Sequence, residues 1–354
     1  MRLQAPRFWE SKGLIARVLW PVSCLYGAII TLRVFLFSLG VLKSRSLPVP
    51  VIFVGNIRVG GTGKTPIVIA LAKDLYWRGF SPGIILRGYR SNLAPDQSQE
   101  VFATSTAQDT GDEALLIAQQ VGPLKIPVWI GAHRHSTGLG LLKKSLGCNV
   151  IISDDGLQHY PLSRDVARNG GHDIEIVVRD FRGEGNGYLL PAGPLRETAT
   201  RPRDMTLDLE IASSLTANTS TRIFAPNTYQ VPCLMQKAYQ LINPKQTQDL
   251  TFWKNQRVLA VAGIAAPEKF FTPLRDLGLN IIALPLEDHV DDSAFNFDRF
   301  DKDKIDVILM TEKDAVKCSH LRDERIWVVP LETQLPHAMM DVICEVIHRP
   351  AKRS

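Results

Sequence analysis

The run VIFVGNIRVGGTGKTP at residues 51–66 restricts the possible folds more than any other part of the chain. Its apolar first part predicts a buried β-strand and its end predicts the start of a helix, with a glycine-rich turn between them. Glycines let backbone N–H groups turn inward around phosphate oxygens, and the helix N-terminus adds partial positive charge. This order is typical of a phosphate-binding loop, or P-loop. Its expected nucleotide-binding residues are Gly60, Gly61, Thr62, Gly63, Lys64 and Thr65.

Two side chains of this loop have expected chemical roles. Lys64 can reach the β- and γ-phosphates of ATP and assist phosphoryl transfer, and the Thr65 hydroxyl can hold Mg²⁺. The common pattern GxxxxGK[ST] has glycine where this chain has Arg58, so Gly60 and Gly61 are expected to supply the flexibility. The alternative is a glycine-rich loop that binds no nucleotide.

Short apolar runs alternate with helix-like segments along most of the chain. Strands are expected at 49–55, 84–86, 128–130, 149–153 and 174–178, and helices at 65–76 and 113–120. This alternation predicts an α/β fold, a mostly parallel sheet with helices on both faces (α/β/α). Further strand-like runs at 257–264, 280–284, 306–310 and 325–330, with a helix at 267–277, predict a second, smaller α/β domain.

The expected division of the chain follows from these patterns. A membrane-associating helical segment occupies 1–46, a P-loop domain 47–211 and the smaller domain 231–354. Between them, residues 212–230 are rich in Ser, Thr, Asn and Ala and predict a linker or an exposed hairpin.

Carboxylates follow the expected strand at 149–153. Asp154 and Asp155 come directly after it, and a hydrophobic strand aims such groups at the ligand-binding edge of an open α/β sheet. We therefore expect at least one of them to bind Mg²⁺ beside the phosphates.

Asp112 precedes another apolar helical run, where it can either cap the helix or act as a base toward an attacking hydroxyl. The sequence pattern leaves these two roles open.

The most apolar stretch of the chain is residues 14–42, interrupted by Arg17 and Arg33. The uncharged run 18–32 is shorter than the roughly 20 residues of a spanning helix. We expect one or two helices that lie in the membrane interface, with arginines reaching toward headgroups. The alternatives are a buried helix pair, a secretory signal, or a single span in which Arg33 is paired.

The composition of the chain limits the classes of molecule that it is expected to bind. The net charge of +5, from 41 basic and 36 acidic residues, is too small to indicate a nucleic-acid protein, and it suits an anionic substrate or membrane. The five cysteines are far apart and form no CxxC pair, which argues against a disulfide framework or a zinc cluster and favours a reducing, cytoplasmic location. No obligate protein partner is inferred.

Several motifs together resemble the tetraacyldisaccharide 4′-kinases of lipid A biosynthesis. They span most of the chain in the expected order. They are VGNIRVGGTGKTP (54–66), RGYR (87–90), GDE (111–113), DDGLQH (154–159), GNGYLLPAGPLRE (185–197), DH (288–289) and TEKDAVK (311–317). Some positions depart from the usual family pattern. These are Leu86 for serine, Arg90 for glycine, Ala114 for proline, and an insertion at 166–173.

The resemblance implies a two-domain α/β/α lipid kinase with nucleotide in the cleft. Such an enzyme transfers the ATP γ-phosphate to the 4′-hydroxyl of a tetraacylated glucosamine disaccharide 1-phosphate, giving lipid IVA. It also implies a location at the cytoplasmic face of the bacterial inner membrane, where the lipid substrate lies. By this resemblance Asp112 is the general base, His289 of the second domain supports it, and Asp155 is the Mg²⁺ ligand.

Further polar residues are candidates for phosphate or substrate contacts, each with a structural alternative. Arg87 can bind phosphate or form a structural ion pair, and Arg196 can bind an anionic group or brace its loop with Glu197. Gln158 and His159 can hydrogen-bond to the substrate sugar or to the groups that surround the metal ligands. For His159, a structural role as a packed histidine with its hydrogen bonds satisfied is nearly as compatible with the sequence. For Lys313 and Asp314 a turn-fixing pair is the favoured interpretation.

Two other functions fit the same loop. A membrane-associated P-loop ATPase would hydrolyse ATP without a lipid acceptor, and a nucleotide-binding adaptor would bind ATP without turnover. Neither needs the LLPAGPLRE run.

Overall fold

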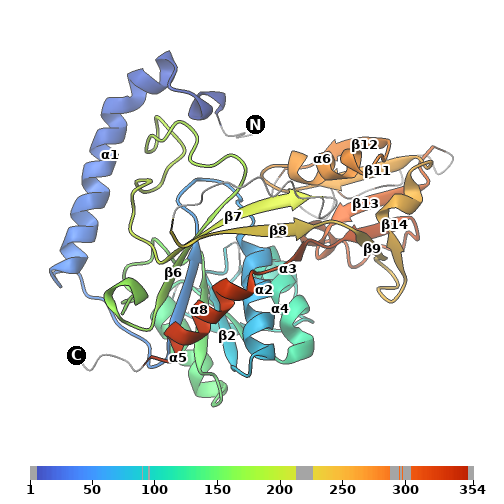
Figure 1. Cartoon of the computed structure of the whole chain (residues 1–354). Helices are drawn as coiled ribbons and strands as arrows, with labels where there is room; N and C mark the ends of the chain where they lie inside the picture. Colours follow the sequence, from blue (N-terminus) through green and yellow to red (C-terminus); the bar gives the residue numbers. More distant parts are fainter. Residues whose placement is uncertain are drawn as a thin grey trace.

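The structure is a computed structural model that describes residues 6–89, 91–94, 96–212, 226–287, 295, 297 and 304–349 (Figure 1). Within these ranges the chain forms two sheets that are covered on both faces, which confirms the predicted α/β class. The helix that follows the N-terminal 3₁₀ turn η1 (Arg7–Glu10) runs along the outside of the larger sheet's domain (Figure 1).

The larger sheet has, among the described residues, nine strands in the order β15-β8-β7-β6-β1-β5-β2-β4-β3. The strands from β8 to β4 are parallel, and β15 and β3 close the two edges in antiparallel orientation. Their bounds are β1 Val51–Gly55, β2 Pro82–Leu86, β3 Ser98–Val101, β4 Val128–Gly131, β5 Val150–Asp154, β6 Ile174–Arg179, β7 Met205–Ala212, β8 Thr228–Leu234 and β15 Glu332–Thr333.

Alternation along the central strand β1 divides the core into two layers, because successive strand side chains point to opposite faces. Ile52 and Val54 enter the layer formed with α2, α4 and α8. Val51 and Phe53 enter the opposite layer, against α5. The helices of this domain are α2 Lys64–Trp77, α3 Ala107–Thr110, α4 Asp112–Val121, α5 Arg134–Lys144 and α8 His337–Ile347, with 3₁₀ turns η2 Gly122–Leu124 and η3 Ala167–Asn169.

The smaller sheet has the order β10-β9-β14-β13-β11-β12 in the described part of the chain. Strands β14, β13, β11 and β12 are parallel, and β9 and β10 add an antiparallel edge. The bounds are β9 Lys237–Gln240, β10 Thr247–Asp249, η4 Leu250–Trp253, β11 Val258–Ala262, α6 Glu268–Asp276, β12 Ile281–Pro285, β13 Val307–Thr311, α7 Glu312–Ala315 and β14 Ile326–Val329. The second α/β unit predicted from the sequence is therefore present.

The two sheets are connected by long strands and by the C-terminal helix. Strands β7 and β8 extend from the larger sheet toward the smaller one (Figure 1). After the smaller sheet, α8 returns and packs Met339, Met340 and Ile343 into the core of the larger one. The domain boundaries expected above remain a prediction. Most of the expected linker, residues 213–225, lies outside the described residues.

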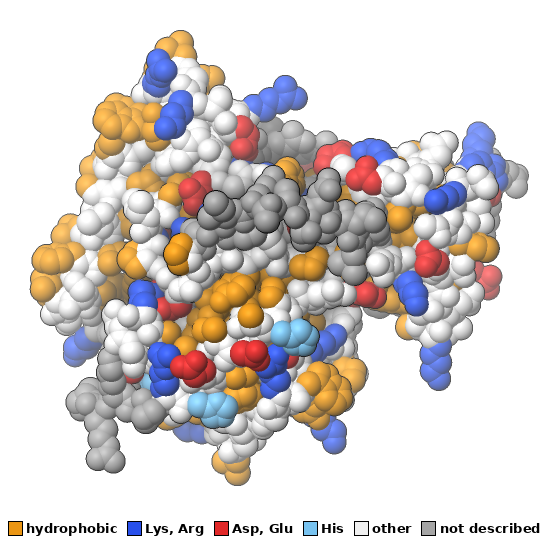
Figure 2. Space-filling view, in the orientation of Figure 1, with side chains coloured by type: hydrophobic (Ala, Val, Ile, Leu, Met, Phe, Trp, Pro, Cys, Tyr) orange, Lys and Arg blue, Asp and Glu red, His pale blue; other side chains and the backbone are white. Residues whose placement is uncertain are grey.

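The apolar N-terminal stretch forms a single helix, α1 (Leu14–Ser38), and among the described residues it is the one long and apolar enough to cross a membrane. Most of its side chains are exposed, including Leu14, Val18, Leu25 and Phe35, and only Ala16 and Ser23 are buried, so the interpretation as a buried helix pair is wrong. Apolar side chains accordingly line the left edge of the molecule, where Figure 1 draws α1 (Figure 2). The Arg33 guanidinium lies 5.9 Å from the ring centres of Phe37 and Tyr160.

The narrow buried side of α1 contacts the predicted motif at 185–197. The Ser23 hydroxyl donates to the Leu189 carbonyl at 2.8 Å and accepts from the Ala192 N–H at 2.9 Å. Tyr26 Oη donates to the Arg196 carbonyl at 3.2 Å. The far side of the same motif bonds the P-loop, since the Val59 N–H donates to the Pro194 carbonyl at 2.9 Å. The motif therefore joins the apolar helix to the phosphate loop.

Candidate active site

A cleft of about 850 Å³ opens between the two sheets. The larger sheet contributes the P-loop, the start of α4, the end of β5 and Arg196, and the smaller one contributes the starts of α6 and α7. The cleft thus lies at the carboxyl ends of the parallel strands, the edge at which ligands bind in open α/β sheets. The predicted loop residues 60–65 all line it.

The P-loop backbone needs glycine at two of its turns. Gly60 and Gly63 have φ of 101° and 91°, which L side chains rarely adopt, and a Cβ on Gly63 would lie 2.7 Å from Leu209 Cδ1. The buried Asn56 braces the loop from inside by donating to the carbonyls of Arg58 and Gly60, at 2.6 and 3.1 Å. Its amide oxygen accepts from Lys64 Nζ at 3.2 Å.

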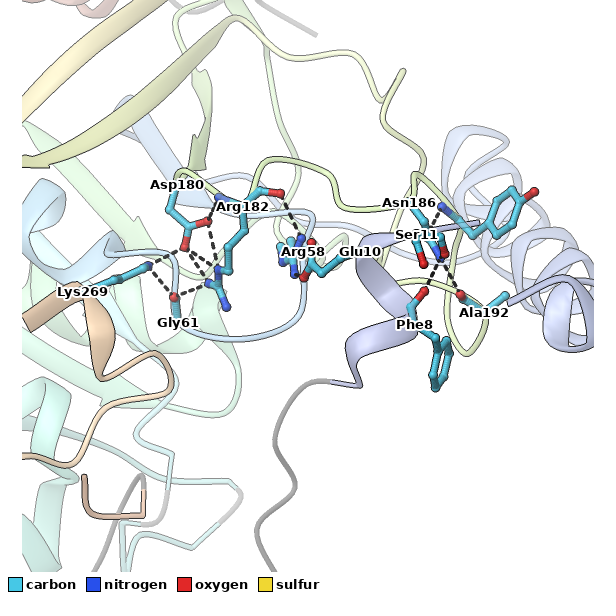
Figure 3. Close-up of polar contacts among 11 residues, drawn as sticks. Phe8, Glu10, Ser11, Arg58, Gly61, Asp180, Arg182, Asn186, Ala192 and Lys269 are labelled. Carbon is cyan, nitrogen blue, oxygen red and sulfur yellow. Dashed lines mark hydrogen bonds and ion pairs between the residues drawn. The ribbon is translucent and has the colours of Figure 1, made fainter. Parts of the chain in front are cut away.

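Arg58, which replaces the usual glycine, points away from the cleft and is 3% exposed. Its guanidinium pairs with Glu10 of η1 and donates to the Arg182 carbonyl at 3.2 Å. The departure from the common pattern therefore has a structural explanation, because this side chain fastens the N-terminal segment to the base of the P-loop (Figure 3).

Three charged groups converge beside the loop. Lys64 Nζ lies 3.3 Å from Asp155 Oδ1, and the Arg196 guanidinium lies 3.3 and 3.4 Å from the two Asp155 oxygens. Burial alone would raise the pKa of Asp155, but the two cations outweigh it and lower the pKa to about 2. Asp155 is therefore a carboxylate at neutral pH, next to the cations that would face phosphate oxygens.

Asp154 differs from its neighbour. It ends β5, paired with Val54 of β1, and is 3% exposed. Burial raises its pKa to about 7, with Glu113 and Asp155 adding to the rise and Lys64 opposing it. Its Oδ1 finds no hydrogen-bond partner in the described part of the chain, and neither does the buried hydroxyl of Thr62.

The donors at this edge suit a hard divalent cation. Mg²⁺ is usually bound through one or two carboxylates together with substrate phosphates, so Asp154, Asp155 and Thr65 fit such an ion. Over the residues that the structure describes, no group of three or more His, Cys, Asp and Glu side chains could hold a metal by itself. The chain thus offers part of a coordination shell, which phosphate oxygens would complete.

Asp112 begins α4, on the same side of the cleft as the P-loop, and faces the second unit. Its carboxylate is 9% exposed, and its Oδ2 lies 3.4 Å from Lys317 Nζ and 3.8 Å from Lys313 Nζ, two lysines of the second unit. The preceding Gly111 has φ of 84°, and a Cβ there would lie 2.6 Å from the Tyr89 carbonyl oxygen. The backbone therefore aims Asp112 into the cleft through a turn that only glycine fits.

Comparison with known proteins agrees with this geometry. The family model described as tetraacyldisaccharide-1-P 4′-kinase, LpxK, matches residues 15–348. The chain belongs to this family. It is 44% identical to the tetraacyldisaccharide 4′-kinase of Polynucleobacter asymbioticus, over 98% of this chain and 96% of that protein. It is 39% identical to that of Coxiella burnetii, over 94% and 92%.

A solved structure of the family has the same fold. It is the crystal structure of an "apo" form of LpxK from Aquifex aeolicus in complex with ATP. The match has a TM-score of 0.73 at 27% identity and covers 95% of this chain and 100% of that chain.

The other residues predicted for this family site divide into two groups. Arg87 and Arg196 line the cleft, together with the P-loop, Asp112, Asp154 and Asp155. Gln158, His159 and Glu197 are not among the residues that line it. His289 lies outside the described residues.

The residues away from the cleft have structural contacts. Gln158 donates to the Asn56 carbonyl at 3.2 Å, and buried Glu197 pairs with Arg201. Burial and the nearby Arg134 and Arg164 lower the pKa of His159 to about 4, so this ring is neutral at physiological pH.

Sequence reasoning did not predict that lysines of the second unit contact Asp112. Asp314 fixes the turn at 311–314 through other partners than the predicted Lys313, because its Oδ2 accepts from the Thr311 hydroxyl at 2.7 Å and from the Gly263 N–H at 2.9 Å. Lys313 and Lys317, however, contact Asp112. Lys313 lies in α7 and Lys317 in the turn that follows it, and their spacing of four residues was the available signal.

Proposed function

We propose that this chain transfers the γ-phosphoryl group of ATP to the 4′-hydroxyl of a tetraacylated glucosamine disaccharide 1-phosphate, giving lipid IVA. The observation that carries the proposal is that Asp112, Lys64 and Asp155 line one cleft, in a chain of the 4′-kinase family. The larger sheet's domain supplies both the phosphate-binding loop and the buried carboxylate for the acceptor, and the second unit adds Lys313 and Lys317 beside that carboxylate.

The donor half of the reaction relies on the P-loop. Its backbone N–H groups and Lys64 bind the ATP phosphates, and Arg196 adds a second positive charge beside them. Thr65, Asp155 and Asp154 would hold Mg²⁺, which supplies neutralisation of the charge that develops between the β- and γ-phosphates. Arg87, which lines the same cleft, is proposed to contact a phosphate group.

The acceptor half relies on Asp112. It accepts the proton of the 4′-hydroxyl as the oxygen attacks the γ-phosphorus in line, and ADP leaves from the opposite side. Lys317 and Lys313 lie 3.4 and 3.8 Å from its Oδ2 and are proposed to hold the carboxylate in position before transfer. His289 is proposed to support Asp112 from the second domain.

The lipid acceptor explains the exposed apolar helix. We propose that α1 inserts into the cytoplasmic face of the bacterial inner membrane, where acylated substrate is available. Its contacts with residues 185–197 place the P-loop on a fixed support next to the membrane surface.

The direct test is phosphoryl transfer by purified protein in detergent, with γ-labelled ATP, Mg²⁺ and the disaccharide lipid. We expect labelled lipid, its loss on chelation with EDTA and its return on adding Mg²⁺. Lys64→Met should abolish the product, whereas Lys254→Met, an exposed lysine of the second unit, should not. Hydrolysis of ATP without labelled lipid would refute the proposal in favour of an ATPase, and nucleotide binding without any turnover would refute it in favour of an adaptor.

A further inference from the structure

The second unit contacts the P-loop directly through Lys269 of α6. Its Nζ donates to the Gly61 carbonyl oxygen at 3.0 Å and pairs with Asp180, which follows β6 of the larger sheet. Figure 3 shows both contacts, with Lys269 reaching Asp180 and Gly61 from the side opposite to Arg58. The side chains of Lys269 and Asp180 are only 8% and 3% exposed.

Arg182 completes the cluster from the larger sheet's own domain. Its guanidinium donates to the Gly61 carbonyl at 2.8 Å and to Asp180 Oδ2 at 2.6 Å. The Asp180 carboxylate therefore holds two cations, and both cations donate to one peptide oxygen of the P-loop. Charge-assisted hydrogen bonds of this kind are about twice as strong as neutral ones.

Holding the Gly61 carbonyl oxygen in place sets the orientation of the whole Gly61–Thr62 peptide. The peptide is planar and trans, so the N–H of Thr62 points to the side opposite to the Gly61 carbonyl. Because the carbonyl is directed at Lys269 and Arg182, the N–H is directed away from them. P-loops bind phosphate through such inward N–H groups. Glycine at position 61 leaves this peptide free to rotate unless something restrains it.

The restraint depends on where the second unit sits. Lys269 lies in the first turn of α6, and Asp314 anchors the start of the segment that links β11 to α6 through the Gly263 N–H at 2.9 Å. A Cβ on Gly61 would be 3.5 Å from Ala265 Cβ of this same segment. Moving the second unit away from the P-loop would therefore remove Lys269 from the Gly61 carbonyl, while Arg182 would stay.

We propose that Lys269, held by Asp180, is a positioning residue through which the second unit orients the Gly61–Thr62 peptide for nucleotide phosphate. The inference rests on the proposed function only in assuming that the P-loop binds ATP. It assigns the affinity of the loop partly to a residue that lies 208 positions away from Gly61 in the chain.

The test measures ATP affinity separately from the lipid reaction. Lys269→Met should raise the KM for ATP and the dissociation constant of a fluorescent ATP analogue about tenfold, the value of one lost charge-assisted hydrogen bond. The KM for the lipid should stay within twofold of the original protein. Lys269→Arg, which keeps the charge, should restore most of the ATP affinity. Lys254→Met is the matched control, an exposed lysine of the same unit, and should change neither constant.

A double-variant comparison separates positioning from a merely stabilising ion pair. Asp180→Asn leaves the buried Lys269 ammonium without its carboxylate partner and should lower Tm. Adding Lys269→Met removes that charge and should restore part of the lost Tm. If the cluster orients the peptide, ATP affinity remains low in the double variant although Tm recovers. If ATP affinity recovers together with Tm, or if Lys269→Met binds the analogue like the original protein, the inference is overturned.

The inference and the proposed function fail in different measurements. A protein that binds the ATP analogue but makes no labelled lipid contradicts the proposed function and leaves the role of Lys269 testable by binding. A protein that makes labelled lipid with an unchanged KM for ATP in Lys269→Met contradicts only the inference.

Discussion

Replacing Asp112 by asparagine tests the assigned base most directly. The amide keeps the shape of the side chain and its acceptor oxygen toward Lys317, but it cannot take the hydroxyl proton. General base catalysis contributes about 10²–10⁴-fold, which is about 3–5 kcal/mol of transition-state stabilisation. We therefore expect kcat to fall by about that factor, while the dissociation constant of ATP stays within threefold, since the Asp112 carboxylate pairs with Lys317 and Lys313 of the second unit.

The Asp112→Asn substitution also destabilises the folded protein, and this effect must be measured separately from the catalytic rate. Asp112 and Lys317 are 9% and 6% exposed, so the variant leaves a buried ammonium facing a neutral amide. Removing one charge of such a buried ion pair costs about 3–5 kcal/mol, and Lys313 at 3.8 Å loses part of its attraction as well. Tm should therefore fall by several degrees.

The assay is single-turnover transfer of labelled phosphate at saturating ATP and lipid, well below the Tm of the variant. Glu113→Gln is the matched control, because Glu113 is the next residue of the same helix and its side chain is 47% exposed. It should keep at least a third of the original rate. An Asp112→Asn protein that is folded and turns over within threefold of the original, or a Glu113→Gln protein equally impaired, would remove Asp112 from the role of base.

Three further changes have defined outcomes. Gly111→Ala forces a side chain into φ of 84° and toward the Tyr89 oxygen, so it should cost at least about 1–3 kcal/mol of stability and reduce kcat with little effect on nucleotide binding, measured by thermal unfolding and initial rates. Glu10→Gln weakens the pair with buried Arg58, and hydrogen exchange should become faster in η1 and in residues 56–60. Glu312→Gln should alter the pH dependence of stability. Burial raises the pKa of Glu312 from 4.5 to about 7, so the folded protein retains a proton that the unfolded chain has released. Stability from this group therefore falls by about 3 kcal/mol as pH rises from about 4.5 to 7. Urea unfolding across that range should show a flatter profile for the variant, and an unchanged profile would contradict the assignment.

The elements predicted from local pattern agree with the structure to within a few residues. The strand expected at 49–55 is β1, and the helix expected at 65–76 is α2. Both have contiguous signals, a β-branched apolar run and a helix start after glycine, so no distant contact is needed to specify them. For the same reason Asp154 and Asp155 could be placed beside the P-loop before the register of β5 against β1 was known.

Strand β8 shows why other elements were not predicted. Its sequence TYQVPCL contains Pro232, which usually argues against a strand because proline lacks an N–H. In the structure β8 pairs with β7 along one side, and on the other side the short β15 pairs only with Cys233 and Leu234. The position is therefore close to an edge, where the missing donor is tolerated. Only the arrangement of the finished sheet provides that information.

The lysines of the second unit likewise make contacts that the local sequence does not predict. Each lysine that it sends to the larger sheet's domain meets a buried carboxylate, Lys269 with Asp180 and Lys317 with Asp112. A lysine in an unremarkable sequence context says nothing about such a partner, since the pairing is decided by two distant segments that approach only after both sheets have formed. The consequence is a cleft whose two walls attract each other through opposite charges, and a phosphate group entering it would meet cations from both walls. The family motifs predict the phosphate-binding loop and the proposed base because each motif is contiguous in sequence, whereas the lysines that contact them are found only in the three-dimensional structure.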